Sequence, residues 1–274
     1  MESHCKNQYT FLITSGGTQE PIDSVRTITN TSTGMLGSLI ADSISEIFQN
    51  AKIFYVCATT AARPKTKSVV CIEIKSTEDL ERTVTELMQK QKIDAVIHSM
   101  AVSDYTVASL SSLDLIYKIA SNFSSSTSNV ESVDIDDFAK KIIDTDTRID
   151  GKKVSSKVKY PVLLLTQTPK VLPIFRKMSK SVIIVGFKLL SNVSKDELLD
   201  TAYNLLIKDG LDFVLANDST KITALGHKAY LVDKNKNAIE FSTKEEIANG
   251  IARSLLKKFS TISKSTNSGD ISLL

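Results

Sequence analysis

Apolar and polar positions follow two alternating patterns along most of the chain. Short runs rich in β-branched and aromatic residues are typical of strands. Most of these runs are followed by a stretch with apolar residues at helical spacing, as in Leu36, Leu39, Ile40 and Ile44. Strands that alternate with helices predict a mostly parallel sheet with helices on both faces. The expected strands are one that begins at Phe11 and those at 52–57, 69–74, 94–98, 162–165, 182–187 and 213–216.

Two details refine this prediction of an α/β, Rossmann-like fold. The runs at 162–165 and 182–187 show no polar alternation, so we expect both to be strands buried on two faces. Polar residues at 233–237 separate apolar runs at 230–232 and 238–241, which predicts a small hairpin. Ligands of such a sheet bind at the carboxyl ends of the strands, where the strand order reverses.

Two stretches depart from the alternation. Residues 106–150 are rich in serine and then acidic, and we expect an inserted flap or flexible excursion with a short helix at 135–143. Residues 260–274 are polar and without periodicity, which predicts a flexible C-terminal tail. Residues 1–259 are then expected to form a single domain.

A glycine turn and a polar loop join the first strand to the first helix. Gly16 and Gly17 allow a sharp turn and a close approach of the backbone to a ligand. Ser32, Thr33 and Gly34 stand where the helix N-terminus exposes unpaired amides, which favours an anion. We interpret the loop as a phosphate cradle, although it contains neither a G-x-G-x-x-G fingerprint nor a G-K-[ST] ending.

Composition limits the partners. A net charge of +3 without a concentrated basic run argues against nucleic acid. The three cysteines, Cys5, Cys57 and Cys71, show no C-x-x-C spacing, so neither a disulfide framework nor a zinc site is expected. The sequence contains no signal peptide and no apolar run of membrane length. We therefore expect a cytoplasmic protein that does not bind a membrane.

The order of several motifs resembles one enzyme family. SGGTQEP at 15–21, IDSVR at 22–26 and ITNTSTGMLG at 28–37 are similar to the N-terminal signature of phosphopantothenoylcysteine synthetases. Further similar segments are SMAVSDYTV at 99–107, GKKVSS at 151–156, TQTPK at 166–170, GFK at 186–188 and LANDST at 215–220. The Ser155–Ser156 pair and the GFKLL segment resemble the monofunctional bacterial type, which implies a nucleotide-binding synthetase domain over 1–259.

The resemblance also implies roles for individual residues. Asn30 is expected to support an acyl-nucleotide intermediate, and Arg26 to hold the phosphate of phosphopantothenate. Ala101 is expected, with these two, to bind the substrate. Lys153 is expected to close over the triphosphate. Asp104 is expected to hold a ribose hydroxyl, a cytosine amine or a Mg²⁺ ion that bridges phosphates. The implied nucleotide-binding residues are Gly16, Gly17, Ser32, Thr33, Gly34, Asp104, Lys153, Gly186, Phe187, Lys188, Asn217 and Asp218.

Plainer interpretations of these residues stay open. Asp104 is equally typical of a turn, Arg26 of a surface ion pair, and Asn217 with Asp218 of satisfied turn residues. His98 lies inside an apolar run, and we interpret it as a core histidine rather than a base. No G-x-S-x-G or H-E-x-x-H motif supports a hydrolase.

The implied reaction joins 4'-phosphopantothenate to cysteine with CTP and Mg²⁺, through an acyl-cytidylate, and gives 4'-phosphopantothenoylcysteine, CMP and pyrophosphate. The family further implies a homodimer with shared active sites. Two alternatives remain: the same ligase with ATP, and a non-catalytic nucleotide- or flavin-binding protein of the same fold. A reductase or epimerase is disfavoured because the glycine fingerprint is missing.

Overall fold

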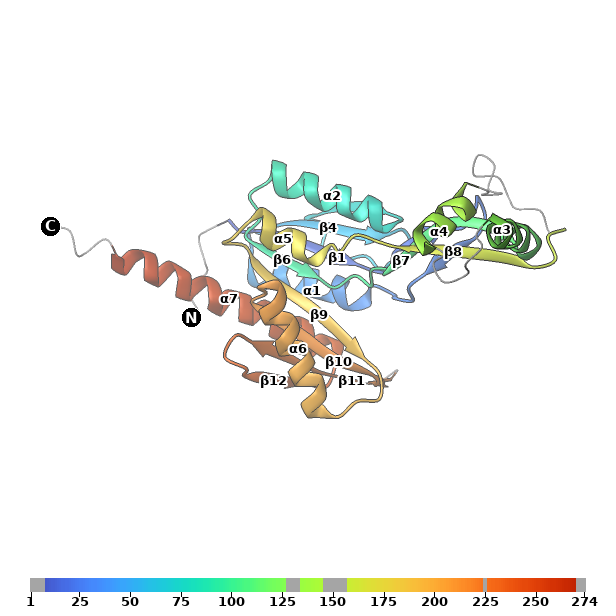
Figure 1. The fold of residues 1–274 in the computed structure, drawn as a ribbon. Coiled ribbons are helices and arrows are strands. Elements are labelled where there is room, and N and C mark those ends of the chain that lie inside the picture. The colour runs from blue at the N-terminus through green and yellow to red at the C-terminus, as the bar shows by residue number, and fades with distance from the viewer. Residues whose placement is uncertain (1–7, 127–133, 145–156, 224–225, 270–274) are drawn as a thin grey trace.

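A central sheet organises the computed structural model, which describes residues 8–126, 134–144, 157–223 and 226–269 (Figure 1). The sheet has eight strands in the order β12-β11-β10-β9-β6-β1-β4-β5. They are β1 (Thr10–Ser15), β4 (Lys52–Ala58), β5 (Val69–Ile74), β6 (Ala95–His98), β9 (Ile183–Leu190), β10 (Phe213–Ile222), β11 (His227–Asp233) and β12 (Ala238–Phe241).

The strand pairing defines a switch point beside β1. Strands β5, β4, β1, β6, β9 and β10 are parallel, and β11 and β12 add an antiparallel hairpin at one edge, as predicted. Numbered in chain order, the six parallel strands are arranged 3-2-1-4-5-6, so the order reverses between β1 and β6. This confirms the Rossmann-like α/β fold and places the ligand crevice at the carboxyl ends of β1 and β6.

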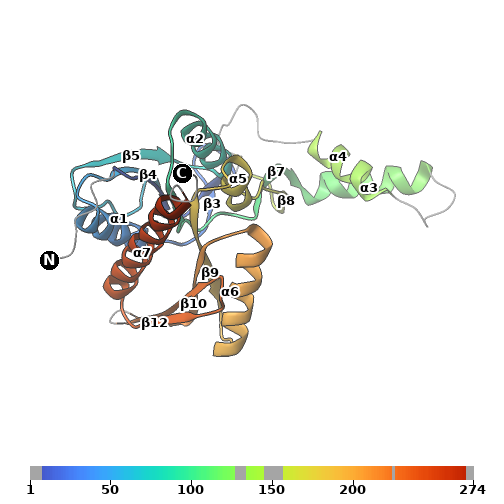
Figure 2. The same cartoon turned by 90° about the vertical axis from the view of Figure 1, so that its left-hand side faces the viewer.

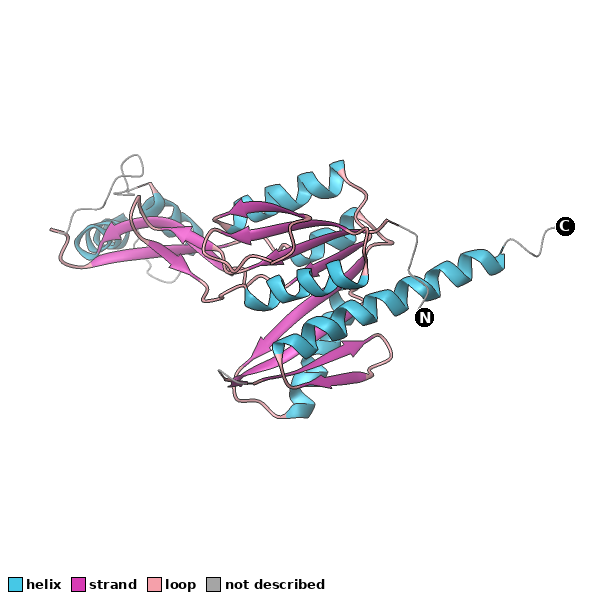
Figure 3. Cartoon of the chain, turned by 180° about the vertical axis from the view of Figure 1, so that it is seen from behind, coloured by secondary structure: helices cyan, strands magenta, loops and turns pink. Residues whose placement is uncertain are grey.

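Helices cover both faces of the sheet (Figures 1 and 2). One face packs on α1 (Met35–Ile47) and α7 (Lys244–Gly269), which share a buried core with β1 and β4. The other packs on α2 (Thr77–Lys90), α5 (Leu172–Met178) and α6 (Lys195–Asp209). Helix α7 extends well past the sheet and continues to Gly269, beyond residue 259 where the sequence pattern ended (Figure 3). None of the described helices combines the length and apolar composition needed to cross a bilayer.

An arm projects from the sheet. It consists of an antiparallel ribbon, β7 (Tyr105–Ser112) and β8 (Pro161–Gln167), with α3 (Leu113–Ser126) and α4 (Ile135–Ile143) (Figure 2). The expected helix at 135–143 is confirmed, whereas β7 and α3 were not predicted. The buried position expected for 162–165 was wrong, because this run pairs with β7 outside the main sheet and leaves Leu163 37% and Leu165 42% exposed.

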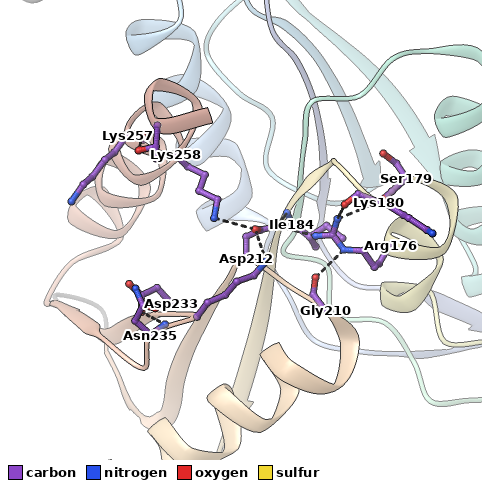
Figure 4. A network of polar contacts seen from close by, with 12 residues as sticks. Arg176, Ser179, Lys180, Ile184, Gly210, Asp212, Asp233, Asn235, Lys257 and Lys258 are labelled. Atoms are coloured by element: carbon purple, nitrogen blue, oxygen red, sulfur yellow. Dashed lines mark hydrogen bonds and ion pairs between the residues drawn. The ribbon is translucent and has the colours of Figure 1, made fainter. Parts of the chain in front are cut away.

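A polar network holds the amino end of the sheet together. The buried Asp212 precedes β10, and its carboxylate accepts hydrogen bonds from Arg176 Nη2 at 2.9 Å and from the Ile184 backbone amide at 3.1 Å. Lys234 Nζ, from the β11–β12 turn, lies 3.0 Å from the same carboxylate, and Lys258 Nζ, from α7, lies 3.5 Å from it (Figure 4). One buried side chain thus joins α5, β9, the hairpin and α7.

Candidate functional site

The loops after β1 and β6 are joined directly at the switch point. Gly16 has a φ of 90°, a conformation that favours glycine, and its carbonyl accepts a 2.8 Å hydrogen bond from the Ala101 amide. The Thr18 amide donates to the Ala101 carbonyl at 3.1 Å, and Gly17 forms a parallel bridge with Ala101. The structure therefore brings the expected residues Gly16, Gly17 and Ala101 together at one edge of the sheet.

Gly17 also sets the position of Asn30. A small hairpin, β2 (Gln19–Pro21) and β3 (Thr27–Thr29), returns the chain to the turn, and the Asn30 amide donates to the Thr18 carbonyl at 3.3 Å. A Cβ atom at position 17 would overlap the Asn30 carbonyl oxygen, so only glycine permits this approach. Asn30 is half-buried, which leaves its side chain accessible beside the crevice.

The N-terminus of α1 is open to an anion. Its N-cap residue Gly34 has a φ of 70° and no side-chain cap, and the contact from Thr33 Oγ1 to the Met35 amide is long, at 3.4 Å. Ser15 Oγ donates to the Gly34 carbonyl at 3.0 Å, and a Cβ at Gly37 would overlap Ser15 Oγ. The first-turn amides of α1 thus lie against the end of β1, where they can bind a phosphate.

The roles that the glycines of a G-x-G-x-x-G fingerprint usually share are here divided among glycines that lie far apart in the sequence. Gly16 makes the tight turn, whereas Gly34 and Gly37 allow α1 to pack closely against β1. The β2–β3 hairpin separates the turn from the helix, so no contiguous G-x-G-x-x-G occurs. Ser32 and Thr33 lie in the segment that leads into α1, as expected for the phosphate cradle.

A cavity of about 640 Å³ lies at the carboxyl ends of β6 and β9, on the side of the sheet that carries α5 and α6. Its apolar wall includes Met100, Val102, Leu172 and Phe187. Its polar groups include His98, Asp104, Lys170 and Lys188. The expected residues Phe187 and Lys188 therefore line a cavity large enough for a small ligand. Gly186, which precedes them, has a packing role, because a Cβ there would lie 2.7 Å from Leu211 Cδ1.

The cavity mouth carries an ion pair that the sequence did not predict. Lys170 Nζ lies 2.5 Å from Asp104 Oδ1, and both side chains are 68% exposed. The Thr168 amide donates to the Asp104 carbonyl at 3.0 Å, and Thr168 Oγ1 donates to the Ser103 carbonyl at 2.5 Å. The lysine of TQTPK at the end of β8 was the available signal, since the loops after β6 and β8 are bonded to each other.

Arg26 lies at the tip of the β2–β3 hairpin. Its Nε and Nη2 donate to Asp23 Oδ2 at 3.0 and 2.5 Å, and this hydrogen bonding raises the pKa of the guanidinium. The Asp23 side chain is fully buried, but the Arg26 side chain is 50% exposed. The ion-pair interpretation is therefore correct, and the outer part of the guanidinium stays accessible to a phosphate.

Asn217 and Asp218 are held by the protein itself. Asn217 Nδ2 lies 2.9 Å from His227 Nε2, and both residues are buried. The Asp218 carboxylate accepts from Thr220, Asn192 and Val193, and these hydrogen bonds, led by that of the Thr220 amide, lower its pKa to about 2. The structure uses Asp218 to fix the turn between β9 and α6, in agreement with the plainer interpretation.

The expected roles of Lys153 and of a metal ion have no counterpart among the described residues of this site. Lys153, with the whole GKKVSS segment, lies outside the described residues. Among the residues that are described, no group of three or more histidine, cysteine, aspartate or glutamate side chains gathers as a metal site. Any ion at Asp104 would therefore take most of its ligands from a bound molecule or from water.

Fold and site together define the class of protein: a Rossmann-like α/β domain with an uncapped helix N-terminus after its first strand and a cavity at the carboxyl ends of β6 and β9. Residues 7–137 and 110–259 match the model of the DNA/pantothenate metabolism flavoprotein C-terminal domain. These two matches cover most of the chain, which belongs to this family.

Three similar proteins illustrate the relationship. The DNA/pantothenate metabolism flavoprotein from Streptococcus pneumoniae shares 34% identity with a TM-score of 0.73, over 93% of this chain and 99% of that one. The coenzyme A biosynthesis bifunctional protein CoaBC of Thermococcus kodakarensis is 25% identical over 238 residues, or 86% of this chain and 48% of that protein. The chain therefore spans about half the length of this curated relative.

A third protein shares the fold alone. It is a mutant of Cab2 solved in complex with phosphopantothenate-cysteine, with 14% identity and a TM-score of 0.65. The match covers 94% of this chain and 89% of that one.

Proposed function

We propose that the chain is a phosphopantothenate–cysteine ligase of the coenzyme A pathway that uses CTP. In the first step a carboxylate oxygen of 4'-phosphopantothenate attacks the α-phosphorus of CTP, the bond to the β-phosphate breaks, and pyrophosphate leaves. In the second step the cysteine amine attacks the acyl carbon and loses a proton, while the bond to the nucleotide breaks and CMP leaves. The product is 4'-phosphopantothenoylcysteine.

The observation that carries this proposal is that an uncapped helix N-terminus and a ligand-sized cavity both lie at the carboxyl ends of the parallel strands in a chain of this family. The amides at the start of α1 suit phosphate oxygens, and the mixed apolar and polar cavity at His98, Phe187 and Lys188 suits a nucleoside. The names of the relatives agree, since one acts in pantothenate metabolism and another in coenzyme A biosynthesis. CTP is favoured because GFKLL and the Ser155–Ser156 pair resemble the monofunctional bacterial type.

The residues of the site suit a reaction that depends on position and charge rather than on a general base. Asn30, anchored beside Gly17, offers an amide that can donate to the developing oxyanion without titrating. Lys170 and Lys188 at the cavity supply positive charge that suits the anionic part of a bound nucleotide. Arg26, exposed at the hairpin tip, suits the phosphate of 4'-phosphopantothenate.

Asp104 fits the Mg²⁺ ion that such a reaction implies. Mg²⁺ bound with nucleotide phosphates needs only one or two carboxylates from the protein, and Asp104 is an exposed carboxylate at the cavity mouth. The ion would supply neutralisation of the triphosphate charge. Lys170, which pairs with Asp104 here, would then be released toward the phosphates.

The arm supports the homodimer that the family resemblance implied. Several of its apolar side chains are exposed, including Leu113, Tyr117, Leu163 and Leu165. A surface of this composition suits contact with a second copy of the chain. In such a dimer the exposed hairpin tip with Arg26 would be free to contribute to the partner's site.

Pyrophosphate release tests the proposal. Purified protein with Mg²⁺ and 4'-phosphopantothenate is compared with CTP and with ATP, each with and without cysteine. We expect release that depends on 4'-phosphopantothenate, prefers CTP, and turns over repeatedly only with cysteine. The same release with a preference for ATP would support the ATP-dependent ligase, whereas no release from protein shown to be folded would favour the non-catalytic binding protein.

A further inference from the structure

His98 lies where the core meets the ligand cavity. It ends β6 beside the switch point, is 7% exposed, and forms part of the cavity wall. His98 therefore borders the cavity as well as the core, whereas the sequence predicted only a core position. A polar ring at this position borders the apolar residues Met100 and Leu172 on the cavity side.

Two contacts fix the orientation of the ring. A hydrogen bond of 2.8 Å joins His98 Nδ1 to Thr14 Oγ1, and Thr14 is fully buried on the neighbouring strand β1. The ring also packs edge-on against Phe175, with centroids 5.4 Å apart. A histidine held on one nitrogen and one ring edge presents its other nitrogen at a defined position.

The second ring nitrogen remains available. Within the described part of the chain, His98 Nε2 has no hydrogen-bond partner, and it is not among the fully enclosed polar atoms that lack one. Since His98 lines the cavity, this nitrogen is reachable from the cavity. A polar atom at the edge of an apolar enclosure is costly unless a ligand or water binds it.

The surroundings indicate which part of a ligand suits His98. Burial lowers the pKa of the imidazole to about 4, so the ring is neutral at physiological pH and does not attract a phosphate by charge. The cationic groups Lys170 and Lys188 serve the charged part of a ligand. A flat heterocycle with apolar faces and a polar edge suits the wall formed by His98, Val102 and Phe187.

We propose that His98 is a specificity-determining residue whose Nε2 hydrogen-bonds the base of the bound nucleotide, with Thr14 and Phe175 holding the ring in place. This inference rests on the proposed function, because it takes the cavity to be the nucleotide site. A fixed hydrogen-bonding group discriminates between bases whose polar edges differ, because the mismatched base leaves it unpaired. His98 would therefore contribute to the choice between CTP and ATP.

Two amide substitutions separate this role from a purely structural one. His98→Asn places its amide near the position of Nδ1, so it can keep the bond to Thr14 but loses the cavity atom. His98→Gln places its amide near Nε2 and loses the bond to Thr14. We expect calorimetry with Mg²⁺ to show an increase of about tenfold in the Kd for CTP, with a reduced preference over ATP, for His98→Asn. His98→Gln is expected to stay much closer to wild type.

The opposite order would overturn the inference. If His98 serves only the core, His98→Gln is the weaker binder with the lower Tm, and His98→Asn resembles wild type in both measurements. If wild-type protein binds neither nucleotide, the proposed function fails together with the inference. If wild-type protein binds CTP and His98→Asn binds it equally well, the inference alone fails.

A measurement on the unaltered chain guards against variants that fail to fold. The sequence contains three histidines, so ¹⁵N-histidine labelling gives few signals to assign. Addition of CTP is expected to shift the His98 Nε2 resonance strongly and that of His227, which is bonded to Asn217, only slightly. An unchanged His98 signal at saturating CTP would contradict the proposed contact.

Discussion

The two ends of the central sheet use polar residues in opposite ways. At the amino end, Asp212 is buried and surrounded by partners from the protein, so its charge is balanced within the fold. At the carboxyl end, α1 begins without a side-chain cap, His98 Nε2 is unbound in the described part of the chain, and Asp104 pairs with Lys170 in the open. Satisfied groups stabilise the fold, while unsatisfied groups at the other end are available to a ligand.

The largest effect is expected from Gly17→Ala at the open end. A Cβ there overlaps the Asn30 carbonyl oxygen, so the loop must move and Asn30 loses its position. A displacement of about 1 Å at a reacting centre costs on the order of a hundredfold in rate, and we expect at least this loss in kcat for pyrophosphate release. The Tm is expected to change little, in contrast to the large loss in kcat for pyrophosphate release.

Gly226→Ala is the matched control. Among the described residues, a Cβ at Gly226 would meet Thr223 Oγ1 at 3.5 Å and the Ser242 carbonyl at 3.7 Å, which are ordinary contacts. This variant should keep its activity. Equal activity losses in both variants would show that the cost is general to glycine replacement and not specific to the cradle.

The next effect is expected from Asp212→Ala at the satisfied end. Removal of the carboxylate leaves Arg176 Nη2 and the Ile184 amide without their acceptor, which costs about 2–3 kcal/mol of unfolding free energy. The Tm should fall by roughly 5–10 °C, while the Kd for nucleotide at a temperature where the variant is folded should not change. If the Kd changed and the Tm did not, Asp212 would serve ligand binding rather than stability. The contrast drawn between the amino and carboxyl ends of the sheet would then be wrong.

The control for this variant is Glu86→Ala. It removes the exposed Lys90–Glu86 pair of α2, in which both side chains are more than half exposed. Because solvent screens such a pair, little change in Tm is expected. A fall in Tm as large as that of Asp212→Ala would mean that burial is not what gives Asp212 its effect.

The smallest effect is expected from Asp218→Asn, and it depends on pH. Hydrogen bonds lower the pKa of Asp218 to about 2, below the value near 3.9 of an unfolded chain. Its contribution to stability is therefore complete above about pH 4 and is lost as the pH falls through about 2. Urea midpoints of wild type and variant should differ most at pH 7 and converge toward pH 2. A difference that stays constant with pH would show that protonation of Asp218 does not change the stability.

Local patterns were sufficient for most of the central fold. The runs that became β1, β4, β5, β6, β9 and β10 were predicted because they are short, apolar and rich in β-branched residues, and the hairpin because a polar turn separated two short runs. The phosphate cradle stays a prediction, made because Gly16 and Gly17 allow a sharp turn and because Ser32, Thr33 and Gly34 precede the exposed amides of a helix N-terminus. The run at 162–165 was misplaced because an apolar run specifies a strand but not the strand with which it pairs.

The remaining part of the site depends on contacts between distant segments. Lys170 reaches Asp104 because the loops after β6 and β8 are bonded together, and no local pattern encodes that pairing. His98 appeared to belong only to the core because the sequence shows the strand but not the cavity at its end. Thr14 Oγ1, which orients it, lies 84 residues earlier.

The arm joins the rest of the molecule beside the ion pair at the mouth of the cavity. Strand β7 begins at Tyr105, directly after Asp104, and β8 ends at Gln167, shortly before Lys170, so the two strands lead to opposite members of one ion pair. The ribbon that joins them pairs from Tyr105 and Gln167 outward to Ser112 and Pro161, with a bulge between Val107 and Ser109. The spacing of β7 and β8 at the root of the arm therefore sets the distance between these two charges at the cavity mouth.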